Sequence, residues 1–267
     1  MIKKSILLFL VTTVMIFGSD GRMDLLEKAN QVVKDFKSMV KIDTREKVFT
    51  VRVDFSDSKI VLFGETNDQS MKDELFSKLT ETLKIPVEDK VTLLPQDSLG
   101  EKVFAIVKVP VVNLMDGPRK VSQKNAVTQA RMGEIVKLLK QSDTWYFVQM
   151  EDSYLGWIND QNLWIIDKRD LNDYLSNKFV LVISRFAEIY SETDKTLLQE
   201  KIVQGTILPF LEADDQWTLV QLPGREKVYM KNTDLAFFNS REEVFSSKKD
   251  ASYIISVAKQ HLGLPYL

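Results

Sequence analysis

The sequence predicts a mainly β protein with an α+β N-terminal unit, two small β-barrels and a C-terminal helix. Three observations lead to this fold class. Before Pro95, two stretches with apolar residues at spacings of three and four alternate with strand-like segments. After Pro95 this helical periodicity disappears, and short β-rich runs follow one another between polar turns. Residues in these runs also recur at a fixed sequence offset, which indicates a duplicated unit.

The N-terminus has the pattern of a signal peptide. Lys3 and Lys4 form a short positive region, and the apolar run 6–17 that follows is of signal-peptide length and too short to span a bilayer. Small residues at 19 and 21 offer a cleavage site, with cleavage after Gly18 as the alternative. We therefore expect residues 1–21 to be removed and the mature chain, without a membrane span, to be exported to the periplasm or cell envelope. No Cys lies near the cleavage point, so we do not expect a lipoprotein.

Residues 22–100 are expected to form a small α+β domain. Helical spacing of apolar residues predicts helices over 23–40 and 71–83, and Asn67 or Asp68 is placed to cap the second. Alternation of apolar and polar residues predicts a strand over 48–55, and shorter apolar runs predict two more strands. The order helix, strand, strand, helix, strand resembles the BON-type periplasmic domain, although no motif indicates chemistry.

An internal repeat relates two segments after Pro95. Eight pairs of like residues are each 72 positions apart: Gly133 and Gly205, Ile135 and Ile207, Leu139 and Leu211, Trp145 and Trp217, Val148 and Val220, Gln149 and Gln221, Trp157 and Tyr229, and Leu163 and Leu235. This single offset predicts two copies of one β-barrel, over 101–167 and 178–238, joined by a helical connector at 168–177.

The first copy carries a recognisable set of motifs. They are Val111-Val112-Asn113-Leu114, Gly133-Glu134, Asp143-Thr144-Trp145 and Tyr154-Leu155-Gly156-Trp157-Ile158. This pattern resembles the bacterial SH3 domain, in which the Gly-Glu pair opens a strand and the Gly-Trp pair closes the barrel. The second copy keeps Gln204-Gly205 and Asp215-Gln216-Trp217, but its Gly-Trp pair has become Val228-Tyr229. The resemblance implies that both barrels are SH3-like.

The C-terminal segment 239–267 is expected to be a polar linker followed by one helix, whose apolar face has almost nothing left in the chain to cover. Residues 254–267, which end in Leu262-Gly263-Leu264-Pro265-Tyr266-Leu267, are similar to the opening helix of the NlpC-type cysteine peptidases that cut peptidoglycan stem peptides. In that family a Trp-Gly-Gly turn and an Asp-Cys-Ser-Gly nucleophile helix come next. The order of segments resembles that of γ-D-glutamyl-L-diamino acid endopeptidases, truncated before the catalytic Cys.

Positions that differ between the two copies are candidates for function, because the barrel does not require them. Glu134 corresponds to Thr206, and Tyr154 corresponds to Glu226. In the peptidases that the chain resembles, a Tyr before the Gly-Trp strand and an acidic residue after the Gly close the pocket around the free amine of the stem peptide. The resemblance therefore implies that Tyr154 and Glu134 bind substrate, which suits a phenol and a carboxylate facing an ammonium.

Matching positions are instead expected to serve packing. On this argument Trp145 and Trp217 belong to the barrel cores, as do Trp157 and Tyr229. The acidic pairs at 151–152 and 214–215 fall in predicted turns, where such side chains bind the local backbone rather than a metal.

The composition excludes several kinds of site. The 267 residues contain no Cys and one His, so no disulfide, thiolate nucleophile, Cys/His metal site or pair of catalytic histidines is available. We therefore predict no catalytic residue, metal or cofactor, and expect His261 to be a surface residue. With 36 Lys and Arg against 38 Asp and Glu, the net charge of −2 argues against nucleic acid as a partner.

The leading functional hypothesis is an exported cell-wall protein that forms the targeting and substrate-gating part of an NlpC-type peptidoglycan endopeptidase. Its expected partners are peptidoglycan stem peptides and a separate peptidase domain, and the chain as given is expected to be inactive. The alternative is a complete non-catalytic SH3-like module that binds cell-wall peptides or another envelope protein. A third hypothesis is a periplasmic scaffold assembled through the α+β domain.

Overall fold

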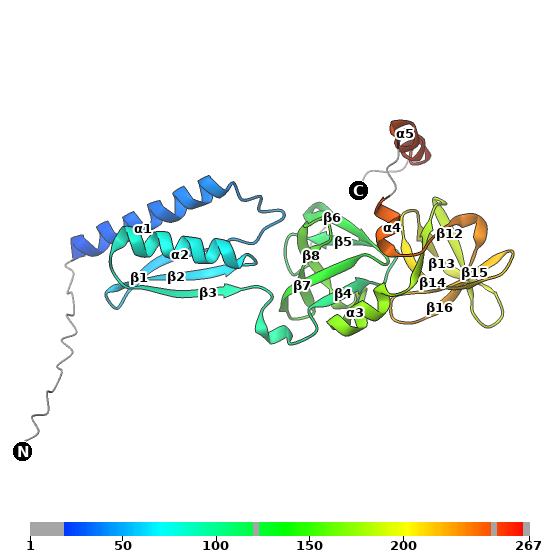
Figure 1. Cartoon of the computed structure of the whole chain (residues 1–267), viewed down its shortest axis with the longest axis horizontal. Coiled ribbons are helices and arrows are strands. Elements are labelled where there is room, and N and C mark those ends of the chain that lie inside the picture. Colours follow the sequence, from blue (N-terminus) through cyan, green and yellow to red (C-terminus); the bar gives the residue numbers. More distant parts are fainter. Residues whose placement is uncertain (1–18, 120–122, 247–249, 264–267) are drawn as a thin grey trace, which may run out of the picture. The chain divides into compact units, whose positions relative to one another are not determined.

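The computed structural model describes residues 19–119, 123–246 and 250–263. They divide into two compact units, one ending at Leu94 and the other beginning at Pro95 (Figure 1). The predicted signal peptide over 1–21 lies outside the described residues except for its last three positions, with which the first helix starts. Within the described part of the chain, no helix is long and apolar enough to cross a membrane.

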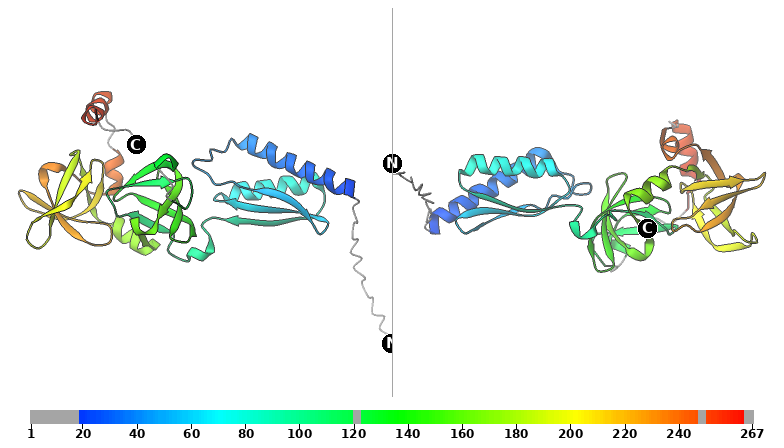
Figure 2. Two further views of the ribbon diagram at one scale, coloured as in Figure 1. Left: turned by 180° about the vertical axis from the view of Figure 1, so that it is seen from behind. Right: turned by 60° about the horizontal axis from the view of Figure 1, so that its bottom comes forward.

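The N-terminal unit is a three-stranded sheet with two helices packed on one face, as both views of Figure 2 show. Its elements are α1 (Ser19–Val40), β1 (Arg52–Ser56), β2 (Lys59–Thr66), α2 (Gln69–Leu83) and β3 (Val87–Leu93). Strands β1 and β2 form an antiparallel hairpin, while α2 carries the chain across to β3, which pairs parallel to β2. Apolar side chains from both helices and the sheet form its core. The predicted element order is confirmed.

Two local features define the ends of these elements. Asp68 caps α2, because its carboxylate accepts a hydrogen bond from the Met71 amide at 3.1 Å. The predicted strand over 48–55 starts only at Arg52, and before it a single bridge joins Phe49 to Thr66. The ladder is interrupted there because the Thr50 hydroxyl, rather than a backbone carbonyl, accepts from the Glu65 amide at 3.0 Å.

The second unit contains two antiparallel seven-stranded sheets. The first sheet consists of β4 (Phe104–Val107), β5 (Val111–Met115), β6 (Ala126–Arg131), β7 (Ile135–Ser142), β8 (Trp145–Met150), β9 (Leu155–Asn159) and β10 (Leu163–Ile166). The second consists of β11 (Lys178–Val182), β12 (Phe186–Ser191), β13 (Leu197–Val203), β14 (Ile207–Ala213), β15 (Trp217–Gln221), β16 (Lys227–Lys231) and β17 (Leu235–Phe238). We call these sheets and their turns the first and second β units.

The two β units share one topology. The strand order β10-β4-β7-β8-β9-β5-β6 of the first is matched by β17-β11-β14-β15-β16-β12-β13 in the second. Hydrogen bonds match as well: the Gly133 amide donates to Val107 at 2.9 Å, and the Gly205 amide donates to Val182 at 2.9 Å. The donors are 72 positions apart and the acceptors are 75 positions apart, so the sequence repeat is a structural repeat whose offset changes along the chain.

The predicted fold class is confirmed as mainly β with an α+β N-terminal unit and a C-terminal helix; the two predicted small β-barrels are two antiparallel sheets that do not close. Among the described residues, the end strands of each sheet do not pair with each other. The hairpin β5–β6 joins its sheet through one residue pair, Met115 and Trp157, and the hairpin β12–β13 joins through two. Each sheet surrounds its own apolar core without closing.

The two β units pack against each other through equivalent residues. Ile135 and Ile207, which are 72 positions apart, lie in one buried cluster with Ile106 and Phe179. The connector helix α3 (Lys168–Leu175) adds Leu171 and Tyr174 to this cluster, and the short helix α4 (Arg241–Ser246) adds Val244. Figures 1 and 2 show α4 at the junction of the two β units. This junction is where the cavity described next is found.

Candidate functional site

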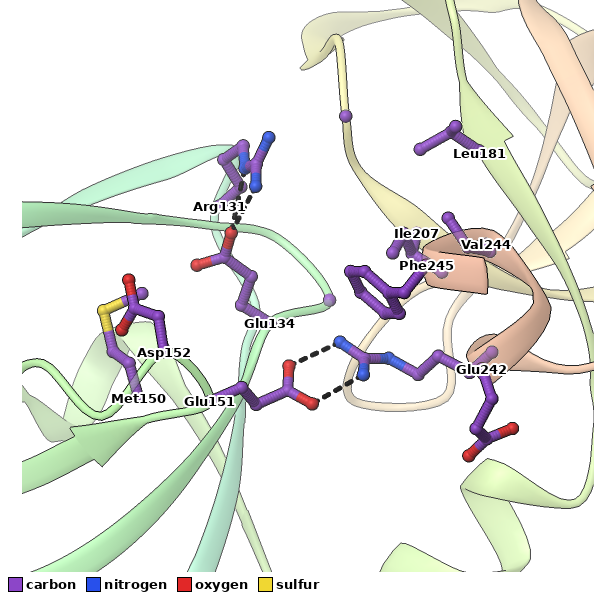
Figure 3. Close-up of a pocket in the computed structure, with 13 residues that line it drawn as sticks. Arg131, Glu134, Met150, Glu151, Asp152, Leu181, Ile207, Glu242, Val244 and Phe245 are labelled. Atoms are coloured by element: carbon purple, nitrogen blue, oxygen red, sulfur yellow. Dashed lines mark hydrogen bonds and ion pairs between the residues drawn. The ribbon is translucent and has the colours of Figure 1, made fainter. Parts of the chain in front are cut away.

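A cavity of about 710 Å³ lies between the two β units and α4 (Figure 3). Its lining combines an apolar wall with several charged side chains. The apolar wall consists of Leu181, Ile207, Val244 and Phe245. The charged side chains are Arg131, Glu134, Glu151, Asp152, Arg241 and Glu242. Such a mixture suits a small ligand that has both an apolar and a charged part.

Glu134, one of the two predicted substrate-binding residues, lies in this lining. Its Oε1 atom accepts from Arg131 Nε at 2.9 Å and pairs with Arg131 Nη2 at 2.8 Å, as the dashed lines in Figure 3 show. Its Oε2 atom is buried and has no hydrogen-bond partner among the described residues. The carboxylate therefore has unused acceptor capacity, which is costly for a buried oxygen.

A second ion pair forms another part of the wall. Arg241 is 6% exposed, and its guanidinium donates to both carboxylate oxygens of Glu151 at 2.6 Å each. This two-point geometry ties α4 to the turn between β8 and β9.

The hydroxyl of Tyr174 is buried without a partner among the residues the structure describes. Burial is the main reason that the pKa of this hydroxyl is raised.

The turn 131–134 positions Glu134 by inserting into the second β unit. Met132 is 1% exposed and belongs to the core of that unit. Gly133 has φ of +82°, a conformation that favours glycine, and an added Cβ would overlap the carbonyl oxygen of Ile207. Both residues fix the backbone immediately before Glu134.

Tyr154, the other predicted residue, is half-buried in the turn between β8 and β9. Its amide donates to the Asp152 carboxylate at 3.0 Å, and its carbonyl accepts from the Met150 amide at 2.9 Å. Met150 at the end of β8 and Glu151 and Asp152 of this turn line the cavity, whereas Tyr154 does not. The structure thus brings Glu134 to the cavity and leaves Tyr154 beside it. A binding role for either residue stays a prediction.

The prediction that the repeated aromatic residues belong to the cores is wrong. Trp145, Trp217, Trp157 and Tyr229 are all half-buried on the outer faces of their sheets. Trp145 lies three positions before the buried Val148, so the two side chains point to opposite faces of the strand. The alternation of side chains between the two faces of a strand is the sequence signal that places these aromatic residues outside the cores.

The segment after residue 239, which is expected to be a polar linker, contains a helix in the structure. Residues 241–246 form α4, which begins after Ser240, whose hydroxyl accepts from the Glu243 amide at 3.3 Å. A Ser followed three residues later by Glu is a helix-capping pattern, and it is the sequence signal for this helix. The burial of Arg241 could not be predicted from the sequence, because Glu151, with which it forms an ion pair, lies far away in the sequence.

The last helix, α5 (Ala251–Gln260), presents apolar side chains to solvent. Ile254 and Ile255 are 60% and 53% exposed, and Leu262, just after the helix, is 76% exposed. His261 is exposed, as predicted, and its Nε2 atom lies 2.8 Å from the side-chain oxygen of Gln204. Over residues 19–119, 123–246 and 250–263, no group of three potential ligand side chains is placed to hold a metal ion.

Comparison with known proteins finds a family model that matches most of the first β unit. Residues 115–163 match the family model described as the bacterial dipeptidyl-peptidase Sh3 domain. A curated relative, the gamma-D-glutamyl-L-lysine dipeptidyl-peptidase of Bacillus cereus, is 28% identical over 151 residues, which cover 52% of this chain and 43% of the relative. The predicted resemblance of the first copy to the bacterial SH3 domain is confirmed, and the matching family is of the dipeptidyl-peptidase type.

A solved structure extends the likeness of the fold. The crystal structure of an NlpC/P60 family protein from Bacillus cereus superposes with a TM-score of 0.53 at 22% identity, over 61% of this chain and 65% of that chain. This chain thus spans less than half the length of its curated relative and about two thirds of the solved one.

Proposed function

We propose that this chain is an exported cell-envelope protein that supplies the targeting and substrate-gating part of an NlpC-type endopeptidase acting on peptidoglycan stem peptides. The observation that carries the proposal is Glu134, whose Oε2 atom has no hydrogen-bond partner among the described residues and which lines a cavity between the two β units, the first of which matches a dipeptidyl-peptidase-type SH3 family over residues 115–163. The name of the curated relative supplies the substrate class, a γ-D-glutamyl-L-lysine peptide. Export is proposed from the pattern of residues 1–21.

The charge of the cavity supports an ammonium as ligand. Its lining has four carboxylates and two guanidinium groups, and each guanidinium already pairs with one carboxylate. The surplus is negative, and Asp152 belongs to the same turn as Tyr154. A peptide with a free amino terminus would place its ammonium against these carboxylates and its apolar side chain against the wall of Ile207 and Phe245.

The chemical step must come from a peptidase domain outside these 267 residues. The sequence contains no Cys, so it offers no thiolate for a cysteine-peptidase mechanism. We expect the purified chain to hydrolyse L-Ala-γ-D-Glu-L-Lys at the rate of a blank, measured by release of the dipeptide. Turnover that disappears on His261→Ala would contradict this expectation, because His261 is the one imidazole present.

The gating role is tested by fusing this chain to the catalytic domain of the Bacillus cereus relative. Tyr154→Ala is expected to lower kcat/KM for peptides with a free amino terminus by about ten- to a hundredfold, since a hydrogen bond to a charged group contributes about 1.5–3 kcal/mol. Glu134→Gln should act in the same direction, because it removes the charge that faces the ammonium.

The control substrate is the same peptide with an acetylated amino terminus, for which both losses should be much smaller. The control variant is Glu226→Gln, the second-unit counterpart of Tyr154, which should leave kcat/KM unchanged. Equal losses for free and acetylated peptides would contradict an amine-binding role. The non-catalytic binding module would be favoured by two results together: the unfused chain binds the peptide specifically, and none of these variants changes the kcat/KM of the fusion.

A further inference from the structure

The outer face of the second β unit carries an aromatic cluster with a lysine lying on it. Tyr190 and Trp217 meet edge to face, with ring centroids 4.7 Å apart. The ammonium of Lys195 lies 4.4 Å from the ring centroid of Tyr229 and 5.3 Å from that of Trp217. Both distances are within the range of a cation–π interaction. The cluster is separate from the cavity described above, since none of its residues lines that cavity.

A carboxylate completes this cluster. Asp214 Oδ1 accepts from the amides of Gln216 and Trp217 at 2.8 and 2.7 Å, so the turn between β14 and β15 holds the side chain in place. Its other oxygen, Oδ2, lies 3.6 Å from the Lys195 ammonium. The two backbone hydrogen bonds are the main reason that the pKa of Asp214 lies below its usual value, so the group is charged at neutral pH.

Lys195 is the part of this arrangement that is held least firmly. It lies in the turn between β12 and β13 with φ of +55°, and its side chain is 37% exposed. Its ammonium is too far from Asp214 for a short hydrogen bond, and an exposed ion pair of this kind contributes little. The two rings and the carboxylate are fixed by strands and by a hydrogen-bonded turn, so they would keep their geometry if Lys195 left.

The first β unit shows what distinguishes this cluster. There Lys140 lies over Phe147 and Trp157, at 5.6 and 5.8 Å. Lys140 belongs to strand β7 itself, not to a turn, and the counterpart of Asp214 at position 142 is a serine. Among the described residues of the two β units, only those of the second combine the aromatic faces, a fixed carboxylate and a cation on a turn.

We propose that Trp217, Tyr229 and Asp214 form a binding site for an alkylammonium group on a methylene chain, the side chain of a lysine in a peptide, which Lys195 occupies until such a ligand displaces it. The identity of the ligand follows from the occupant, because Lys195 presents this same group to the site. The aromatic faces attract the cation, the methylene chain contacts the rings, and Asp214 supplies the opposite charge.

The test removes the occupant. In the full chain with Lys195→Met, the indole N–H resonance of Trp217, assigned with Trp217→Phe, is followed while Nα-acetyl-lysine amide is added. We expect Lys195→Met to bind this probe about tenfold more tightly than the unaltered chain, because an internal competitor has been removed. Adding Asp214→Asn should abolish the gain. The matched control, Lys140→Met, should leave the response of Trp217 unchanged.

Three probes define the ligand. Nε-acetyl-lysine amide, which has no charge on its side chain, should not shift the Trp217 resonance. Alanyl-alanine amide, whose ammonium is an amino terminus without a methylene chain, should bind weakly. An unresponsive Trp217 in Lys195→Met, an equal response to the charged and neutral lysine probes, or a stronger response to alanyl-alanine amide would each overturn the proposal.

Discussion

Gly133→Ala is expected to lower the free energy of unfolding of the 95–263 unit by about 4 kcal/mol, near the upper end for a single substitution. At φ of +82° any side chain is strained by about 1–2 kcal/mol. The added Cβ would also overlap the carbonyl oxygen of Ile207, which is backbone and cannot rotate away. The overlap can be relieved only by separating the two β units, which would expose the buried cluster between them.

Gly205→Ala provides the matched control at the equivalent position of the repeat. Its φ of +85° imposes the same strain, but the atom that its Cβ would meet is the tip of the flexible Arg131 side chain. We therefore expect a cost of about 1–2 kcal/mol, from the backbone alone. The measurement is urea unfolding followed by tryptophan fluorescence, which reports on this unit because all four Trp residues lie in it. Equal costs for the two variants would show that the contact with Ile207 does not matter.

The repeat explains why much of the second unit could be predicted from the sequence. Strands β7 to β10 and β14 to β17 begin at positions that differ by 72, as the recurring residues require. The same comparison singled out Glu134, which the structure places at the cavity, because a carboxylate there is not needed by the fold. Local signals also predict structure, as Asp68 does for the start of α2.

The parts that could not be predicted depend on contacts between the two copies. The repeat equates Met132 with Gln204, yet Met132 is inserted in the core of the neighbouring unit, while Gln204 is half-buried and hydrogen-bonded to Ile183 at 2.7 Å. A comparison of two copies shows which positions differ and says nothing about what each position touches. The Arg241–Glu151 pair was missed for the same reason, because its partners lie 90 positions apart.

Met132→Ala should accordingly destabilise the 95–263 unit by about 3 kcal/mol. The side chain is 1% exposed and belongs to the core of the second β unit, to which the described residues of the first β unit contribute no other buried residue. Truncation removes apolar contacts and leaves a cavity that the surrounding strands cannot fill, and buried Met to Ala changes cost about 2–5 kcal/mol. Because Met132 precedes Gly133 and Glu134, the same substitution loosens the turn that positions the carboxylate at the cavity.

The control is Gln204→Ala at the equivalent position, which removes the hydrogen bond to Ile183 and the exposed contacts with Gln260 and His261, and should cost about 1 kcal/mol. Urea unfolding followed by tryptophan fluorescence measures both variants, and Trp217→Phe in each background separates the signal of the second β unit from that of the first. A cost for Met132→Ala no larger than that for Gln204→Ala would mean that the inserted side chain does not hold the two β units together. The cavity between them would then depend on the buried cluster of Ile135 and Ile207 and on the Arg241–Glu151 ion pair.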